Sequence, residues 1–376
     1  MTLEQVVAHH RVVLCVGSGG VGKTTTAAAL AVGAAHRGRR TAVLTVDPSQ
    51  RLKDALGLRH LDGKPRRVPL AAGAHLDAQL LDVKQTFDDL VRTLTGDPAH
   101  VQRILGNRLY QNLSGTLAGS AEYMAVESVF RLVEEDAYDL VVVDTPPAQH
   151  AVDFLDAPRR LLAFLDSRAL AVLKDPTSIL PGATSRLAQM LLSSVLSGLE
   201  RFTGVGLVRE VSEFVAAIEG LTGALRTRVA QVAALLASEA TELVLVTTPH
   251  PRLTADTSDL VQSLDARGLR IGGVIVNRAL PEALFGPHAP DAGVPSGLSP
   301  ALGMKLEHSF AELRREAAGQ QATLAPLLAA AGAPRLAQVP PLATPPVTVA
   351  GLEQLAQLLF GEPGRRAHTA SSSGRA

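Results

Sequence analysis

Short runs of apolar residues recur along the chain, and longer stretches with helical spacing separate them. The strongest runs, rich in Val, Leu and Ile, cover residues 11–16, 41–46, 140–143, 243–247 and 271–276, with a weaker one at 336–339. Runs that are apolar at every position suit strands buried on both faces of a parallel sheet. Residues 24–37 are rich in Ala and precede Gly38, so they predict a helix after the first strand. The alternation predicts an α/β fold with a doubly wound, mostly parallel sheet.

The spacing of the predicted strands is uneven. Residues 80–117 read as helical, and so does most of the long stretch between the runs at 140–143 and 243–247. Apolar residues recur there at helical spacing, namely Leu187, Met190, Leu191, Val195, Leu199 and Phe202, then Val211, Phe214, Val215, Ile218, Leu221 and Leu225. We therefore expect one domain over residues 1–360, with a helical subdomain inserted at about 80–117 and 158–238. Residues 285–300 read as a loop, and the polar tail 361–376 as disordered.

Composition narrows the classes of partner. The chain of 376 residues has 36 basic and 36 acidic residues, no Trp and 3% aromatic residues. Zero net charge gives no overall field for nucleic acid, and few aromatic side chains could stack on bases, so we expect no nucleic-acid partner. The single cysteine, Cys15, lies in the first apolar run, which excludes a zinc or metalloid site built from several cysteines of one chain. The N-terminus lacks the pattern of a signal peptide, and we expect a cytoplasmic protein.

A glycine-rich segment carries the clearest chemical signal. The segment Gly17-Ser18-Gly19-Gly20-Val21-Gly22-Lys23-Thr24 fits the pattern GxxxxGK[ST], follows a predicted strand and opens a predicted helix. Its glycines allow several backbone N–H groups to face one phosphate, and the helix N-terminus adds partial positive charge. Lys23 would bind the β- and γ-phosphates, and the Thr24 hydroxyl would coordinate Mg²⁺. The sequence therefore predicts a P-loop NTPase that binds ATP with magnesium and hydrolyses it.

Two aspartates end predicted strands and are candidates for the chemistry. Asp144 follows the run at 140–143, where a carboxylate would face the ligand crevice of an α/β sheet and hold Mg²⁺ through water. Asp47 follows the run at 41–46 and could orient the attacking water, because phosphoryl transfer depends mainly on positioning. Capping of the next turn is the structural alternative for both residues, and it is the stronger alternative for Asp47, which precedes Pro48.

These segments together resemble the ArsA-type ATPases, the family of the arsenite-pump ATPases and of the ATPase that targets tail-anchored membrane proteins. The loop with its double glycine, extended to Thr25, resembles the family's deviant phosphate-binding loop. The segments from Val46 to Asp54 and from Asp144 to His150 resemble its two switch segments, in which the residue matching Asp47 acts in hydrolysis. The resemblance implies that Asn277 and Arg278 lie at the adenine, with Pro340 in the loop beside that base.

The sequence also departs from this family's pattern. Ser18 stands where many relatives carry a second lysine that reaches the partner protomer's phosphates, and Gln149 stands where the second switch usually has glycine. The chain lacks the paired cysteines that bind zinc or metalloid in some members. A charge supplied across a dimer by residue 18 is therefore not expected.

The resemblance implies a Mg²⁺-dependent ATPase, a homodimer that binds ATP and ADP and switches conformation for a partner or client protein. An alternative is a targeting factor whose helical insert binds a hydrophobic client or membrane protein, with residues 187–202 and 208–225 as candidate groove helices; packing of these residues on the sheet is the simpler interpretation. A positioning ATPase of the MinD/ParA type is a third alternative. It fits less well, because the tail is short and not amphipathic and the net charge is zero.

Overall fold

The computed structural model describes residues 2–71, 73–107, 110–111, 120–166, 220–282 and 298–361. The chain divides into two compact units. The sheet unit comprises Met1–Leu81, Arg131–Val152 and Ala237–Ala376, and the helical unit comprises Asp82–Phe130 and Asp153–Leu236. The helical unit thus covers residues 82–130 and 153–236, where the sequence predicts helical insertions at about 80–117 and 158–238.

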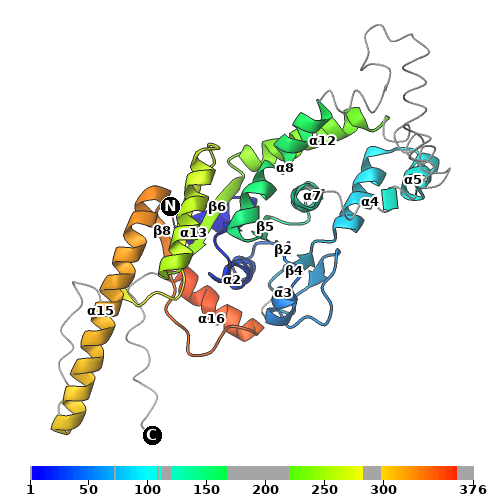
Figure 1. Cartoon of the computed structure of the whole chain (residues 1–376). Coiled ribbons are helices and arrows are strands. Elements are labelled where there is room, and N and C mark those ends of the chain that lie inside the picture. The colour runs from blue at the N-terminus through cyan, green and yellow to red at the C-terminus, as the bar shows by residue number, and fades with distance from the viewer. Residues whose placement is uncertain are drawn as a thin grey trace, which may run out of the picture. The chain divides into compact units, whose positions relative to one another are not determined.

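The sheet unit is built on one sheet of eight strands in the order β3-β4-β2-β5-β1-β6-β7-β8. Figure 1 labels β2, β4, β5, β6 and β8 of this sheet. All neighbouring strands are parallel except β3 and β4. In chain order the strands are β1 (Val12–Val16), β2 (Thr41–Thr45), β3 (Arg66–Arg67), β4 (Leu76–Leu80), β5 (Leu140–Asp144), β6 (Thr241–Thr247), β7 (Ile271–Val276) and β8 (Arg335–Gln338). The predicted doubly wound, mostly parallel α/β fold is thus confirmed.

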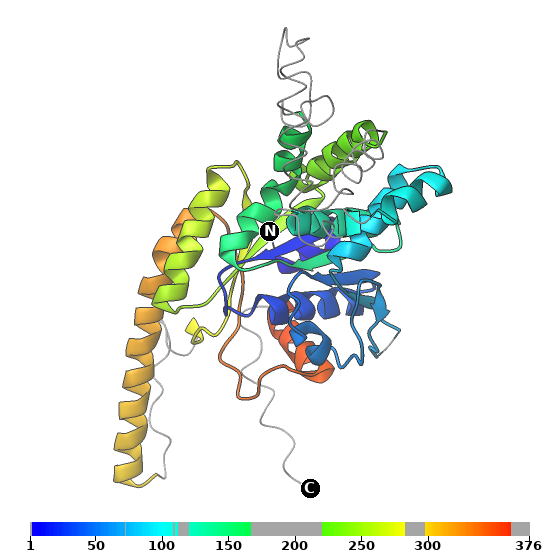
Figure 2. The ribbon, with the colours of Figure 1, turned by 45° about the vertical axis from the view of Figure 1, so that its right-hand side comes forward.

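Helices cover the central strands, which are buried at every position of β1, β2 and β5. Helix α2 (Lys23–His36) follows β1, and its many alanines let it lie close to the sheet and to α16 (Val349–Phe360). Helices α1 (Leu3–His9) and α3 (Arg51–Ala55) complete this core. Helix α13 (Pro251–Asp265) packs on β6 and lies alongside the long α15 (Pro300–Ala331), as Figure 2 shows.

Two strands at one edge of the sheet were not predicted. Strand β4 alternates apolar residues with Asp77 and Gln79, so it lacks the continuous apolar run on which the prediction relied, and β3 has only two residues. The expected helix from residue 80 is wrong at its start, because Leu80 ends β4 and Asp82 caps α4 (Val83–Leu94) by accepting a 2.9 Å hydrogen bond from Gln85 N.

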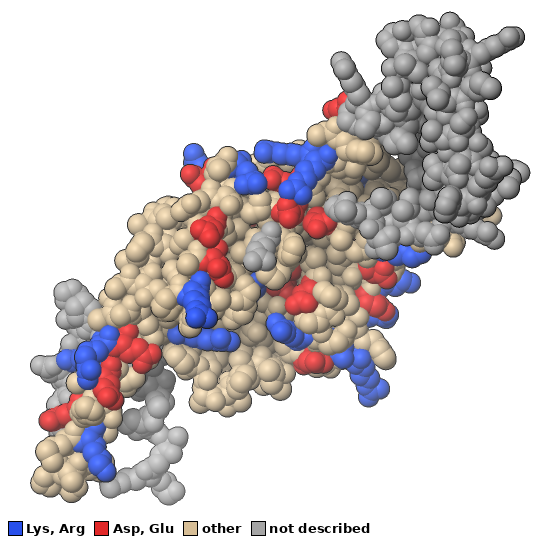
Figure 3. Space-filling model, viewed as in Figure 1, with Lys and Arg blue, Asp and Glu red and all other residues tan. Residues whose placement is uncertain are grey.

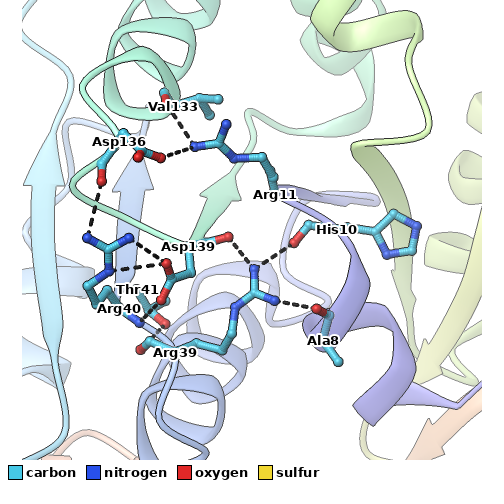
Figure 4. Close-up of polar contacts among 9 residues, drawn as sticks. All are labelled: Ala8, His10, Arg11, Arg39, Arg40, Thr41, Val133, Asp136 and Asp139. Carbon is cyan, nitrogen blue, oxygen red and sulfur yellow. Dashed lines mark hydrogen bonds and ion pairs between the residues drawn. The ribbon is translucent and has the colours of Figure 1, made fainter.

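An arginine cluster ties together the chain segments that precede β1, β2 and β5 (Figure 4). The Arg39 guanidinium donates hydrogen bonds to the carbonyl oxygens of Ala8, His10 and Asp139. Arg40 pairs with the Asp139 carboxylate, with 2.6 Å between Nη2 and Oδ1. Burial lowers the pKa of Arg39, the Asp139 charge opposes that shift, and Arg11 adds to it. The Arg39 cluster therefore joins three segments that are far apart in sequence at the end of the sheet where these strands begin.

The helical unit has a small core of its own. Helices α4 and α5 (Pro98–Leu105) contribute Val91 and Ile104, which pack with Tyr110 and Leu221. Its other described helical residues belong to α7 (Ser120–Glu134), α8 (Ala148–Leu165) and α12 (Thr222–Ala237), which run across the boundaries between the units. Predicted apolar positions from Leu187 to Ile218, most of the predicted loop 285–300 and the tail from residue 362 lie outside the described residues.

A buried ion pair joins α7 to α12 within the helical unit. Arg228 Nη2 lies 2.7 Å from Glu127 Oε1, and both side chains are buried. Tyr123 Oη donates a 3.1 Å hydrogen bond to Glu127 Oε2. A buried charge is costly unless it is paired, so this pair favours one packing of the two helices.

Candidate functional site

The phosphate-binding loop lies between the end of β1 and the first residue of α2, as predicted. At two positions of the loop, a neighbouring atom lies too close to the backbone for any residue other than glycine. A Cβ atom on Gly17 would lie 2.2 Å from Val246 O, and one on Gly22 would lie 2.4 Å from Asn277 Nδ2. Gly22 also has φ of 96°, a left-handed conformation that favours glycine. Gly19, Gly20 and Val21 complete the loop, and Val21 is fully buried.

The Lys23 side chain bends back over this loop. Its ammonium donates 2.9 Å hydrogen bonds to Gly17 O and Ser18 O, and the residue is only 8% exposed. Burial lowers the pKa of Lys23, whereas the charges of Asp144, Cys15 and Asp47 raise it. A cation is therefore held at the N-terminus of α2, beside Thr24 and Thr25, where it can exchange backbone oxygens for those of a phosphate.

Asp144 ends β5 beside this lysine and is almost completely buried, at 1% exposure. Its Oδ2 accepts a 2.9 Å hydrogen bond from Thr45 Oγ1, but its Oδ1 has no hydrogen-bond partner within the described residues. Burial raises the pKa of Asp144, and the Thr24 and Thr45 hydroxyls and the Lys23 charge oppose that rise. The Cys15 thiol, paired in register with Asp144, is also buried, and burial raises its pKa.

The donor set at Asp144 fits a hard cation. Because this buried carboxylate oxygen accepts no hydrogen bond from the described residues, it is available to Mg²⁺ or its water, and the neighbouring Thr24 hydroxyl adds a second oxygen. Asp144 and Thr24 are the residues that would hold magnesium, and the metal would neutralise phosphate charge there. Thr45 was missed in the sequence, although its place opposite Asp144 in the adjacent strand could have indicated it.

Asp47 lies just beyond β2 and is half-buried. Its Oδ1 accepts a 2.8 Å hydrogen bond from Ser49 N, and its own N–H donates to Thr45 Oγ1 over 3.3 Å. In this arrangement Asp47 stabilises the turn before α3, which is the capping alternative recognised from the sequence. In the segment expected to form the second switch, the Thr145 hydroxyl donates a 2.7 Å hydrogen bond to Cys15 O.

Ser18 points into the interior of the sheet unit. It is fully buried, and its Oγ lies 2.7 Å from Thr257 Oγ1 and 3.1 Å from Leu253 O, both in α13. The side chain at the position where relatives carry a second lysine is therefore occupied by contacts within its own chain. Sequence reasoning missed Thr257, because no local pattern marks a helix residue that meets the loop from 239 positions away.

Asn277 follows β7 and also contacts the loop. Its Nδ2 donates a 2.8 Å hydrogen bond to Val21 O, so it supports the loop beside Gly22. Arg278 is exposed, with a left-handed φ of 56°. Pro340 is brought near this segment, because Val339 N donates to Val276 O over 2.8 Å and Ala279 N donates to Val339 O over 3.0 Å. The adenine contacts of Asn277, Arg278 and Pro340 remain predictions.

The charged side chains on one face of the described protein are mixed in sign. Figure 3 shows Lys and Arg interspersed with Asp and Glu among the coloured residues of this face. Within the described residues, no three His, Cys, Asp or Glu side chains are grouped so that they could hold a metal ion. In the same part of the chain, no helix has both the length and the apolarity needed to cross a bilayer.

Comparison with known proteins agrees with this geometry. The family described as anion-transporting ATPase matches residues 10–286. An uncharacterized protein of Streptomyces coelicolor is 33% identical over 273 residues, which are 72% of this chain and 63% of that protein. ATPase get3 of Aspergillus terreus is 32% identical over 165 residues, 43% of this chain and 46% of that protein. ATPase GET3 of Paracoccidioides lutzii is 26% identical over 272 residues, 70% of this chain and 71% of that protein.

The chain spans less than two thirds of the length of the Streptomyces and Aspergillus relatives. The family match, however, runs from the residues just before β1 past the end of β7, and so includes the phosphate-binding loop, Asp47, Asp144 and Asn277. The chain belongs to the anion-transporting ATPase family, the ArsA type that its loop and switch segments resemble.

Proposed function

We propose that this protein is a Mg²⁺-dependent ATP hydrolase. The observation that carries the proposal is the meeting of Lys23 and Asp144 at the carboxyl end of the central strands. There a buried carboxylate oxygen of Asp144, which has no hydrogen-bond partner among the described residues, lies beside the start of α2. One end of this site has a cation and backbone N–H groups for phosphate, and the other has oxygen ligands for a hard metal.

Each residue has a distinct role in this proposal. Lys23 and the loop from Gly17 to Thr25 bind the β- and γ-phosphates, which spreads the charge that develops on them during hydrolysis. Asp144 and Thr24 hold magnesium. Asp47 exchanges its hydrogen bond with Ser49 N for one to the attacking water, which it orients in line with the bond to ADP.

Hydrolysis would drive a conformational switch for a partner protein. Asp47 and the segment from Asp144 to His150 flank the site, so nucleotide can order them and product release can relax them. Assembly as a homodimer, a hydrophobic client and a cytoplasmic location stay predictions from the sequence. Much of the apolar helical stretch that would bind a client lies outside the described residues.

The test is ATP hydrolysis and nucleotide binding by purified Lys23→Ala and Asp47→Asn variants. Lys23→Ala should reduce kcat/KM about 100-fold or more, because one preorganised charge on the transition state is lost. Asp47→Asn should keep Mg²⁺-ATP binding and lose turnover. Lys84→Ala removes an exposed lysine that pairs with Asp88 in the helical unit, and it should match the wild type. Undiminished hydrolysis by Lys23→Ala would contradict the proposal.

A further inference from the structure

Two buried hydroxyl groups connect the phosphate-binding loop to α13. Ser18 Oγ and Thr257 Oγ1 are 2.7 Å apart, and both residues are fully buried. Thr257 Oγ1 lies 2.6 Å from Leu253 O, one turn earlier in α13, and Ser18 Oγ lies 3.1 Å from the same oxygen. The three groups form a closed cluster between residues that are remote in sequence.

The number of protons and the lengths of the contacts together favour one direction for these bonds. Each hydroxyl has one proton to donate. The shorter contact to Leu253 O belongs to Thr257, so Thr257 donates to that carbonyl, and Ser18 donates to Thr257 Oγ1. Both donors are then satisfied. Removal of the Thr257 hydroxyl would leave Ser18 only its longer contact with Leu253 O.

The same serine holds the catalytic lysine through its backbone. Ser18 O accepts a 2.9 Å hydrogen bond from Lys23 Nζ, as does the preceding Gly17 O. Gly17 is itself confined by Val246 O at the end of β6. The side chain of Ser18 therefore fixes the orientation of a peptide group whose carbonyl determines where the Lys23 ammonium lies.

We propose that Thr257 is a positioning residue that acts through Ser18 to preorganise the phosphate-binding loop, and so sets its affinity for nucleotide. The proposal rests on the proposed function, that the loop binds ATP. Preorganisation matters because a loop that must be ordered on binding loses conformational entropy at that step. Since α13 packs on β6 and α15, Thr257 also links the loop to the helices on its side of the sheet unit.

Thr254 provides a matched control on the same helix. It is also buried, at 6% exposure, but its hydroxyl shares its proton between Thr248 O and His250 O, and neither of these hydrogen bonds reaches the loop. Thr254→Val removes a comparable buried hydroxyl from α13. A general loosening of α13 would weaken ATP binding in both Thr254→Val and Thr257→Val. Loss of the positioning of Ser18 would weaken it in Thr257→Val alone.

The experiment measures binding of a fluorescent ATP analogue with Mg²⁺, together with kcat and KM, for the full chain. Thr257→Val should raise the Kd about tenfold, the cost of one buried hydrogen bond. Thr257→Ser, which keeps the hydroxyl, should restore the Kd to within about twofold of wild type, and Thr254→Val should bind normally. Ser18→Ala should show the same loss as Thr257→Val, and the double variant should lose no more than either single variant.

Several results would overturn the positioning role. These are wild-type affinity in Thr257→Val, an equal loss in Thr254→Val, no rescue by Thr257→Ser, or losses that add in the double variant. If Thr257→Val does not fold, as judged by circular dichroism, Thr257→Ser is compared with Ser18→Ala. The positioning role then requires a Kd near that of wild type for Thr257→Ser and a Kd about tenfold higher for Ser18→Ala, and equal Kd values would overturn it. Absence of ATP binding by the wild type would instead contradict the proposed function, so the two failures are distinguishable.

Discussion

Thr45 and Asp144 lie opposite each other in the parallel strands β2 and β5, and Thr45 Oγ1 donates a 2.9 Å hydrogen bond to Asp144 Oδ2. This bond restrains one oxygen of the carboxylate at the end of β5. Asp144 Oδ1 accepts no hydrogen bond from the described residues, although it is buried. The carboxylate is thus oriented by one oxygen while the other is available to a ligand.

Asp144→Asn should stabilise the protein without nucleotide and abolish its Mg²⁺-dependent hydrolysis. Burial raises the pKa of Asp144 above the usual 3.8, so the ionised form destabilises the folded state at pH values above the raised pKa. This cost disappears as the pH falls toward 3.8. The Tm of Asp144→Asn should exceed that of wild type at pH 8, and the difference should shrink at lower pH.

Asp139→Asn is a control in which the change in Tm should have the opposite sign. The hydrogen bond from Arg40 lowers the pKa of Asp139, so the ionised carboxylate stabilises the folded state above the usual 3.8 and loses that effect as the pH falls through the lowered pKa. The Tm of this variant should lie below wild type at pH 8. If both variants shift the Tm in the same direction, the burial of Asp144 is not the cause.

Ser18→Lys tests whether position 18 faces the interior. Because Ser18 is fully buried against α13, a lysine there would have to bury its charge or displace the helix. We expect a loss of roughly 3 kcal/mol in the free energy of unfolding, measured by urea denaturation. Ser18→Ala should lose only about 1 kcal/mol. Unchanged stability of Ser18→Lys would show that the side chain can turn outward.

Gly22→Ala should weaken both folding and nucleotide binding. The new methyl group would meet Asn277 Nδ2 at 2.4 Å, and φ of 96° is unfavourable for alanine. We expect about 2 kcal/mol of destabilisation and a clear rise in the Kd for ATP. Gly38→Ala is the matched control, since Gly38 has φ of 83° with no atom within 4 Å of the added Cβ. It should lose about 1 kcal/mol and bind ATP normally.

Arg39→Met should lower stability without changing nucleotide affinity. The methionine keeps much of the aliphatic stem but loses the hydrogen bonds to Ala8 O, His10 O and Asp139 O at the other end of the strands from the site (Figure 4). We expect a loss of about 2 kcal/mol, measured by urea unfolding. Arg40→Met, at an exposed position, should have a smaller effect. A changed Kd for ATP in Arg39→Met would argue against a purely structural role.

The central sheet and the phosphate-binding loop were predictable because their signals are local. Continuous apolar runs identified β1, β2 and β5, and fixed spacing identified Lys23 and Thr24. Strand β4 was missed, since Asp77 and Gln79 interrupt its apolar pattern. The charge of Asp77 is balanced by Arg67, whose Nε lies 2.7 Å from Asp77 Oδ1. Arg67 belongs to the paired edge strand, and only the folded sheet brings the two side chains together.

The direction of a side chain depends on contacts that sequence spacing does not reveal. Ser18 was identified as a departure from the family pattern, but its inward orientation follows from packing against Leu253 and Thr257 in α13. Asn277 was expected at the adenine, and the structure adds a hydrogen bond to Val21 O. In both cases a residue near the proposed nucleotide site also holds the loop in place.

The hydrogen bonds of Lys23 to the backbone of its loop have a consequence for the proposed nucleotide binding. An ammonium has three N–H donors, and Gly17 O and Ser18 O accept hydrogen bonds from two of them. A bound phosphate would therefore share the Lys23 charge with these carbonyl groups or replace them. When a phosphate leaves, the same carbonyl groups can take its place, and no cation is left stranded in a buried position. Within the proposed function, the carbonyl groups of the loop therefore take part in setting how tightly Lys23 holds a phosphate.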